Sequence, residues 1–328
     1  DGLARRKGEG LQEVPFRSLV SDARVYALAP DPAGGLMIGT AGGLVHRSPA
    51  GELTAIDHGG ALPSEFIYSL EEDGEGGLWV GTPLGLVQWA GGRVRAPVDP
   101  VLRDAAGLSL LRDREGRVWI GLVSGGVLVL EGDSVRSMGP HEGVSRQAIW
   151  DMAQDSTGGV CHGTKGDGAI RISDEGIRRN TTDDGLGDNF VWQIMTDSRG
   201  DVWFFTGRGL NRLSHGRMMY YGTSAGLQDL EGAAGATLED AGGDLWFGVG
   251  SGVYRYRPGL DREGPPPSDL NLETILVGGI QVPRTVREFP PRPCVINFRF
   301  SAPTYRNEEG LSFRHRLAGF DEEWSEPE

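Results

Sequence analysis

The chain has 328 residues, with 46 Asp or Glu against 32 Lys or Arg, and its formal net charge is −14. A negative chain repels a phosphate backbone, so nucleic acid is not an expected partner. The two cysteines cannot supply a disulfide framework, and no run of 18 apolar residues predicts a membrane-spanning helix.

The sequence contains six copies of one motif, in which an Asp is followed by Gly, an apolar pair and, in three copies, Gly-Thr. The second copy, residues 73–86, reads D-G-E-G-G-L-W-V-G-T-P-L-G-L. The leading acids recur about every 42 residues, as Asp31, Asp73, Asp113, Asp155, Asp197 and Asp240. An apolar side chain precedes five of them at one offset, as Tyr26, Tyr68, Leu108, Trp150 and Trp192. Such regularity indicates that one supersecondary unit is stacked repeatedly.

Each copy predicts four short strands, here called A to D in chain order. In the second copy these cover residues 67–71, 78–82, 86–89 and 94–97, and a tight Asp-Gly turn joins A to B. Residues 2–5 match a strand C whose A and B strands would precede Asp1. A period of this length with four strands favours an all-β fold, a β-propeller over residues 1–260. We expect seven blades, or six if the first residues only close the last blade.

A second unit is expected after the repeats. Three consecutive prolines at residues 265–267 predict an extended spacer, and alternating strands follow at residues 272–277, 295–301 and 311–317. We expect residues 268–328 to form the N-terminal part of an Ig-like β-sandwich. Cys161 and Cys294 then fall in different units and are not expected to pair.

The repeats resemble the two-component regulator propeller family, whose pattern is D-x-x-G-x-L-W-I-G-T followed by G-L. Residues 184–191, D-G-L-G-D-N-F-V, match the entry to the next strand in that pattern. The tail, from Val295 through Phe298 to residues 316–321 and Trp324, resembles the first part of a Y_Y_Y domain. Three departures stand out: Cys161-His162 replace Trp-Ile, Phe204-Phe205 replace Ile-Gly, and no Thr follows Gly248.

The resemblance implies a ligand-sensing ectodomain of a bacterial signal-transduction protein, outside the inner membrane and linked to a histidine kinase or diguanylate cyclase. It implies no catalysis in this region, no cofactor, and a ligand that is a small molecule, glycan fragment or protein. Two alternatives stay open. One is a propeller enzyme, a lyase or glycan-acting enzyme that uses the channel rim. The other is a structural propeller that forms a homodimer through the sandwich.

The repeated residues themselves predict structure rather than chemistry. The Asp belongs to the A–B turn, the Trp in strand B packs between blades, and Cys161-His162 lacks a partner pair at zinc spacing, so no metal site is expected. Recognition is expected in the variable connections between strand D and the next strand A, which share one rim with the B–C turns. The candidate ligand-binding residues are Glu65, Arg146, Lys165, Asp188, Asn189 and Arg208.

Overall fold

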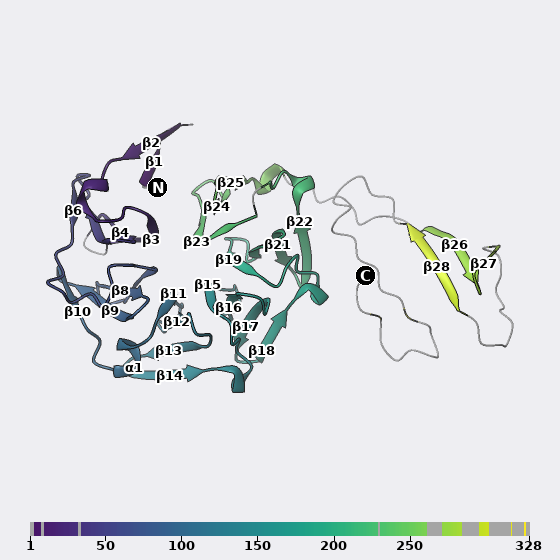
Figure 1. The fold of residues 1–328 in the computed structure, drawn as a ribbon, viewed down its shortest axis with the longest axis horizontal. Coiled ribbons are helices and arrows are strands. Elements are labelled where there is room, and N and C mark those ends of the chain that lie inside the picture. The colour runs from purple at the N-terminus through teal and green to yellow at the C-terminus, as the bar shows by residue number, and fades with distance from the viewer. Residues whose placement is uncertain are drawn as a thin grey trace.

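The chain forms a succession of short antiparallel strands that circle a common centre, as the computed structural model shows (Figure 1). The structure describes residues 3–7, 10–31, 34–228, 230–260, 271–283 and 295–301, together with Arg316 and Ser325. Within these residues, no helix is long and apolar enough to cross a membrane.

The first three repeats form four-stranded sheets. Sheet 1 consists of β3 (Val25–Pro30), β4 (Leu36–Thr40), β5 (Gly43–Arg47) and β6 (Leu53–Ala55). Sheet 2 consists of β7 (Ser69–Glu72), β8 (Leu78–Thr82), β9 (Gly85–Ala90) and β10 (Arg93–Arg95). Sheet 3 consists of β11 (Gly107–Arg112), β12 (Val118–Leu122), β13 (Val127–Glu131) and β14 (Ser134–Met138).

The next three repeats continue the pattern. Sheet 4 consists of β15 (Ile149–Gln154), β16 (Val160–Thr164), β17 (Ala169–Ser173) and β18 (Gly176–Asn180). Sheet 5 consists of β19 (Val191–Thr196), β20 (Val202–Thr206), β21 (Gly209–Ser214) and β22 (Arg217–Tyr221). Sheet 6 has three strands, β23 (Gly232–Glu239), β24 (Leu245–Val249) and β25 (Gly252–Tyr256).

Two smaller sheets flank these six. One is the hairpin of β1 (Leu3–Lys7) and β2 (Gly10–Val14), and the other contains β26 (Asn271–Val277), β27 (Ile280–Val282) and β28 (Ile296–Ser301). Short helices occupy the loops: α1 (Pro100–Arg103) and the 3-10 helices η1 (Arg17–Leu19), η2 (Pro140–Glu142), η3 (Thr182–Asp184), η4 (Thr223–Ala225) and η5 (Pro258–Leu260).

The predicted strands of the second copy agree with sheet 2 except at strand A, which begins at Ser69 rather than at residue 67. In sheet 1 the B–C turn pairs with the loop before strand A, where Ala41 N–H donates to the Arg24 carbonyl. Pro83 stands at the corresponding position of sheet 2 and has no N–H to donate. Two tail strands were predicted close to β26 and β28, and the third, at residues 311–317, lies outside the described residues except for Arg316.

Each repeated Asp organises the turn between strands A and B. In sheet 5 the Asp197 carboxylate accepts backbone N–H groups from Arg199 and Asp201, both at 3.0 Å, and the indole N–H of Trp203 at 3.0 Å. Trp203 is fully buried, so this bond satisfies a donor that has no access to water. The same Trp–Asp bond occurs in sheets 3 and 6.

A nitrogen-bearing side chain from strand C takes the place of the indole where the Trp is missing. Cys161 stands at the Trp position of sheet 4, and there the Arg171 guanidinium donates to Asp155. Burial is the largest single effect and acts against ionisation of Asp155, but the bonds from Arg171 and Thr157 together outweigh it and hold the pKa of that carboxyl below its usual value. In sheet 1, Met37 replaces the Trp and His46 Nε2 lies 2.9 Å from Asp31.

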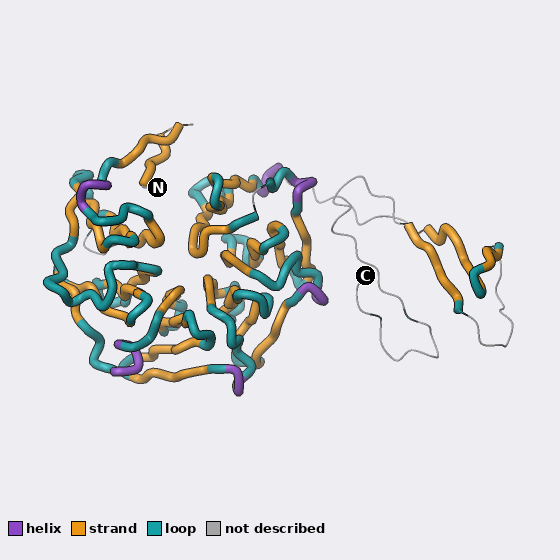
Figure 2. The backbone as a smooth tube through the Cα atoms, viewed as in Figure 1, coloured by secondary structure: helices purple, strands orange, loops and turns teal. Residues whose placement is uncertain are grey.

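Neighbouring sheets approach closely near the centre of the ring (Figure 2). A Cβ added to Gly39 would lie 2.7 Å from the Ile67 side chain of sheet 2, and one on Gly121 would lie 2.7 Å from Ile149 of sheet 4. Any side chain at these two positions would collide with the following repeat, so both positions require glycine.

The strand that faces Phe205 differs from the corresponding strands of the other sheets. Phe205 occupies the glycine position of sheet 5, and the facing strand β23 carries Gly232, where an added Cβ would lie 3.1 Å from the Phe205 ring. The pairing of β23 with β24 shifts between Gly232 and Thr237, a larger irregularity than in the other sheets. The bulky residue is thus accommodated by the next sheet.

Replacement of Asp197 by Ala tests the role of the turn. We expect Asp197→Ala to lower the free energy of unfolding by at least about 3 kcal/mol, because a buried indole donor and two turn N–H groups lose their acceptor. Urea denaturation followed by circular dichroism measures the change. Asp183→Ala, at an exposed loop acid, is the control and should stay within about 0.5 kcal/mol. A loss of less than 1 kcal/mol for Asp197→Ala would contradict the assignment.

Candidate functional site

One rim of the ring is formed by the B–C turns together with the loops that lead into strand A. The backbone links the two sets repeatedly: Lys165 N–H donates to the Ala148 carbonyl at 3.1 Å, and Gly207 N–H donates to the Phe190 carbonyl at 3.0 Å. Turns also bond to the following loop, as Gly168 N–H does to the Asn189 carbonyl. The predicted sharing of a rim is confirmed, and the rim is a continuous surface that spans several sheets.

Aromatic side chains gather on this rim in two groups of three. Between sheets 1 and 2, the ring of Phe66 lies 4.5 Å from Tyr26 and 4.9 Å from Tyr68, measured between centroids. The second group, between sheets 4 and 5, contains Trp150, Phe190 and Trp192, with centroids separated by 4.3 to 6.2 Å.

The aromatic groups follow from the strand geometry. Pairing shifts at Tyr26, Trp150 and Trp192, which are the extra residues of β-bulges at the start of their innermost strands. A bulge turns its extra side chain away from the regular face of the sheet. Sequence reasoning found the recurring offset of these residues but not their clustering on the rim, and it missed Phe66 and Phe190. An aromatic two residues before the bulge was the available clue.

Four of the six predicted ligand-binding residues lie together between sheets 4 and 5. Lys165 pairs with Phe190 as an isolated β-bridge, and Arg208 follows the Gly207 that bonds to Phe190. Asp188 accepts the Phe190 N–H at 2.8 Å, and the Asn189 side chain accepts the Thr182 N–H at 2.9 Å. These two polar residues shape the loop, whereas the side chains of Lys165 and Arg208 are exposed.

The other two predicted residues lie elsewhere on the rim. Arg146 is exposed, and its backbone packs against the Gly125 turn of sheet 3. Glu65 lies beside the first aromatic group, where its carboxylate is 3.0 Å from His58 Nε2 and close to the Gly43 turn. The six residues therefore occupy one rim but do not converge on a single point.

Inside the ring, the residue after the bulge links sheets 3, 4 and 5 each to the following sheet. The Ser109 hydroxyl donates to the Ile149 carbonyl at 3.0 Å, and Gln193 Nε2 donates to the Ala233 carbonyl at 2.5 Å. At this position in sheet 4, the Asp151 carboxylate accepts the Ile194 N–H at 2.9 Å. Loss of hydration raises the pKa of Asp151 to about 7, against the opposing effect of the N–H groups that donate to it.

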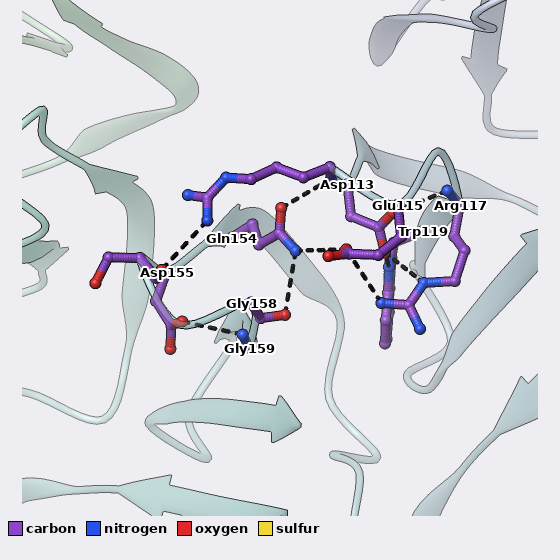
Figure 3. Close-up of polar contacts among 10 residues, drawn as sticks. Asp113, Glu115, Arg117, Trp119, Gln154, Asp155, Gly158 and Gly159 are labelled. Atoms are coloured by element: carbon purple, nitrogen blue, oxygen red, sulfur yellow. Dashed lines mark hydrogen bonds and ion pairs between the residues drawn. The ribbon is translucent and has the colours of Figure 1, made fainter. Parts of the chain in front are cut away.

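The opposite rim, where the A–B turns lie, holds an open groove of about 720 Å³ between sheets 3 and 4. Figure 3 shows the network beside it, in which Gln154 accepts from Arg114 N–H and donates to both Glu115 and the Gly158 carbonyl. Glu115 also lies 3.5 Å from Arg117. The groove contains none of the predicted ligand-binding residues, and its Arg117 and Arg171 side chains are paired with the turn acids Asp113 and Asp155.

The Cys161-His162 pair lies in the core of sheet 4. No group of three or more His, Cys, Asp or Glu in the described part of the chain could hold a metal ion. Cys161 is buried, and burial raises its pKa to about 12, which keeps the thiol protonated. His162 is fully buried against Trp119, with ring centroids 5.7 Å apart, and its Nε2 has no hydrogen-bond partner. Both side chains act as parts of the core.

The sheets and their arrangement are typical of a β-propeller, and the comparisons agree with this class of fold. The family model for the two component regulator propeller matches residues 61–83 and 185–208. No curated protein sequence matches the chain.

Solved structures share the fold at low sequence identity. The extracellular domain of a candidate hybrid two-component system, BT3049 of B. thetaiotaomicron, is 20% identical with a TM-score of 0.69, and the match covers 98% of this chain and 49% of that one. Virginiamycin B lyase of Staphylococcus aureus is 14% identical with a TM-score of 0.56, covering 73% and 85% of the two chains. PorZ of Porphyromonas gingivalis is 17% identical with a TM-score of 0.54, covering 74% and 39%. The chain thus spans about half of the BT3049 domain.

Burial of His162 predicts a specific loss of stability in acid. Burial lowers its pKa to about 4, whereas the unfolded chain binds the proton near pH 6.5, so stability falls as the pH drops from 6.5 towards 4. We expect His162→Ile, which installs the residue found at this position as Ile38 and Ile120, to reduce that loss, and to be at least as stable as the parent at pH 7.5. Urea midpoints at pH 7.5 and pH 5 measure both effects. Equal pH dependence in the two proteins would show that His162 is not the group responsible.

Proposed function

We propose that this chain is a non-catalytic ligand-sensing ectodomain of a membrane-linked signal-transduction protein, on the periplasmic or extracellular side. The observation that carries the proposal is the match of two repeats to the regulator propeller model, combined with a rim whose variable loops carry exposed, unpaired cations and aromatic groups. Variable loops on a rigid scaffold are a common place for recognition. The ligand is a small molecule, glycan fragment or protein, and the output domain is a kinase or cyclase.

The alternative of a propeller enzyme has one specific observation in its favour. His58 and Glu65 form a His–carboxylate pair on the rim, and the lyase structures share the fold at TM-scores near 0.56. A single pair within one loop provides a possible acid or base but no second catalytic group among the described residues, so the sensor is the better-supported proposal.

A ligand screen separates the two functions. We expect a bound ligand to raise the melting temperature of the chain and to be recovered chemically unchanged, as mass spectrometry after overnight incubation would show. The Lys165→Gln and Arg208→Gln pair should weaken that thermal shift, whereas His58→Ala should not. Conversion of the ligand that is abolished by His58→Ala would instead establish the enzyme.

We further infer that the ring has seven blades and that β1 and β2 are the outer strands of one of them. Leu3 packs with Ile38 and Val45 on the outer half of sheet 1, while Leu28 on the inner half of the same face is 50% exposed. The corresponding residues Leu70 and Ile194 are only 8% and 2% exposed.

The other end of the series shows the same opening. Leu238 of sheet 6 is 62% exposed, whereas its counterpart Met195 in sheet 5 is 8% exposed. Both open faces point to the position that two inner strands of a seventh blade would fill. The same proposal covers the division of the chain into domains. Residues 1–260 form the propeller, and residues 268–328 form the start of a Y_Y_Y-type sandwich through which a homodimer forms.

A fusion tests the seventh blade. A copy of residues 65–84, placed before Gly2 so that the Leu3 and Leu86 registers coincide, should supply strands A and B. We expect its melting temperature to rise by at least about 3 °C, because apolar area on sheets 1 and 6 becomes buried. The same fusion with Asp in place of Trp79 and Val80 is the control. No difference between the two fusions would count against a seven-bladed ring.

A further inference from the structure

The rim between sheets 4 and 5 combines aromatic side chains with cations that form no ion pair with a described residue, whereas Arg24 beside the first aromatic group is paired with Asp22. The apolar part between sheets 4 and 5 is the group of Trp150, Phe190 and Trp192, and the cationic part consists of Lys165 and Arg208. We call these five residues the rim cluster. The backbone of Phe190 connects them, because Lys165 pairs with it on one side and Gly207, next to Arg208, bonds to it on the other.

The aromatic part offers ring faces for stacking and contains two indole N–H groups without an acceptor. All three rings are half-buried, and the Phe190 and Trp192 centroids are only 4.3 Å apart in a tilted arrangement. The indole Nε1 atoms of Trp150 and Trp192 are buried and have no hydrogen-bond partner. A buried donor left without an acceptor is costly.

The cationic part forms no ion pair with a described residue. Lys165 and Arg208 are exposed, although the whole chain has a net charge of −14. Acids on the same rim are hydrogen-bonded to other groups: Asp188, beside Gly207, accepts the Phe190 N–H, Asp167 accepts the Ser145 hydroxyl, and Asp151 accepts the Ile194 N–H.

The first aromatic group provides an internal comparison. Tyr26, Phe66 and Tyr68 occupy equivalent bulge and loop positions, with similar ring spacing. Their B–C turns carry Ala41-Gly42 and Pro83-Leu84 where sheets 4 and 5 carry Lys165 and Arg208. The same scaffold is therefore present without the cations, so the cations are a feature of the rim cluster and not of the repeat.

We propose that the rim cluster binds a small planar organic anion, in which an aromatic ring joined to a carboxylate stacks on Trp150, Phe190 and Trp192 while Lys165 and Arg208 hold the carboxylate. Aromatic rings stack or meet edge to face at such spacings, and charge-assisted hydrogen bonds from Lys and Arg are the strong class for carboxylates. The inference rests on the proposed sensing function and specifies the ligand class for it.

The test uses 2-naphthoate as the probe, with 2-naphthamide as its neutral analogue and cyclohexanecarboxylate as its non-planar anionic analogue. Isothermal titration calorimetry measures affinity, and ¹⁹F NMR of protein labelled with 5-fluorotryptophan locates binding, with Trp150→Phe and Trp192→Phe used to assign the two resonances. We expect 2-naphthoate to bind at least tenfold more tightly than either analogue and to shift the Trp150 and Trp192 resonances.

Substitutions then separate charge from stacking. The double variant of Lys165→Gln and Arg208→Gln should lose about tenfold in affinity for 2-naphthoate and little for the amide. Arg95→Gln with Arg179→Gln, two exposed cations on outer strands, is the matched control and should bind as the parent does. Trp192→Leu should weaken both probes. Unchanged melting temperatures show that the variants are folded.

The outcomes distinguish this proposal from the broader one. Equal affinity for 2-naphthoate and 2-naphthamide at Trp150 and Trp192 would overturn the anionic ligand class and leave the rim as a binding site. Binding of 2-naphthoate that the double variant does not weaken would also overturn it. If none of the three probes perturbs either resonance at millimolar concentration, the rim cluster is not a site for planar anions. A ligand found in the broader screen would then support sensing through another surface.

Discussion

The close approach of neighbouring sheets at the centre of the ring constrains the rest of the structure. At Gly39 and Gly121 a Cβ would lie within 2.7 Å of the next sheet, so the spacing of the innermost strands is set by the absence of a side chain. This spacing brings the residues after the bulges of sheets 3 and 5, Ser109 and Gln193, within hydrogen-bonding distance of the following sheet. When Phe205 breaks the rule, the next sheet compensates with Gly232 and an altered register. Close packing and hydrogen bonds to the backbone therefore determine which residues can stand in the inner ring. Few positions there can vary to suit a ligand.

The turn aspartates show how a repeat can vary in sequence while its physical requirement stays the same. The carboxylate must accept turn N–H groups, and its second oxygen needs a donor in a buried setting. An indole supplies that donor in sheet 5, the guanidinium of Arg171 in sheet 4, and His46 lies at the same place in sheet 1. The donor comes from strand B in the first case and from strand C in the others. The departure at Cys161 is thus accompanied by a substitute in the same sheet.

The sequence predicted most strand limits of the second repeat because these limits depend on local turn chemistry. The expected four strands occur in sheets 1 to 5, whereas sheet 6 has three strands among the described residues. The sequence also predicted the shared rim from local turn chemistry, since B–C turns must lie at the strand ends opposite the A–B turns. It did not predict that strand A of sheet 2 starts at Ser69, because that depends on the missing N–H of Pro83 across the sheet. The sequence pointed to Lys165, Asp188, Asn189 and Arg208 as loop residues, but it could not separate Asp188 and Asn189, which bond to their own loop, from the unpaired cations. Phe190 was missed because its role depends on contacts with a bulge residue 40 positions away, Trp150.

The two regions in which this chain departs most from uniform repetition are physically independent. The exposed inner faces at Leu28 and Leu238 belong to sheets 1 and 6 and concern closure of the ring, whereas the rim cluster lies between sheets 4 and 5. Closure is governed by apolar area, and recognition at the rim is governed by aromatic faces and unpaired charge, so the two respond to different perturbations. Salt would weaken the attraction of an anion to exposed Lys165 and Arg208 but would not weaken burial of apolar faces between sheets. Sheet 5 contacts both of its neighbours, because Gln193 bonds across to sheet 6 while Phe190 and Trp192 face sheet 4.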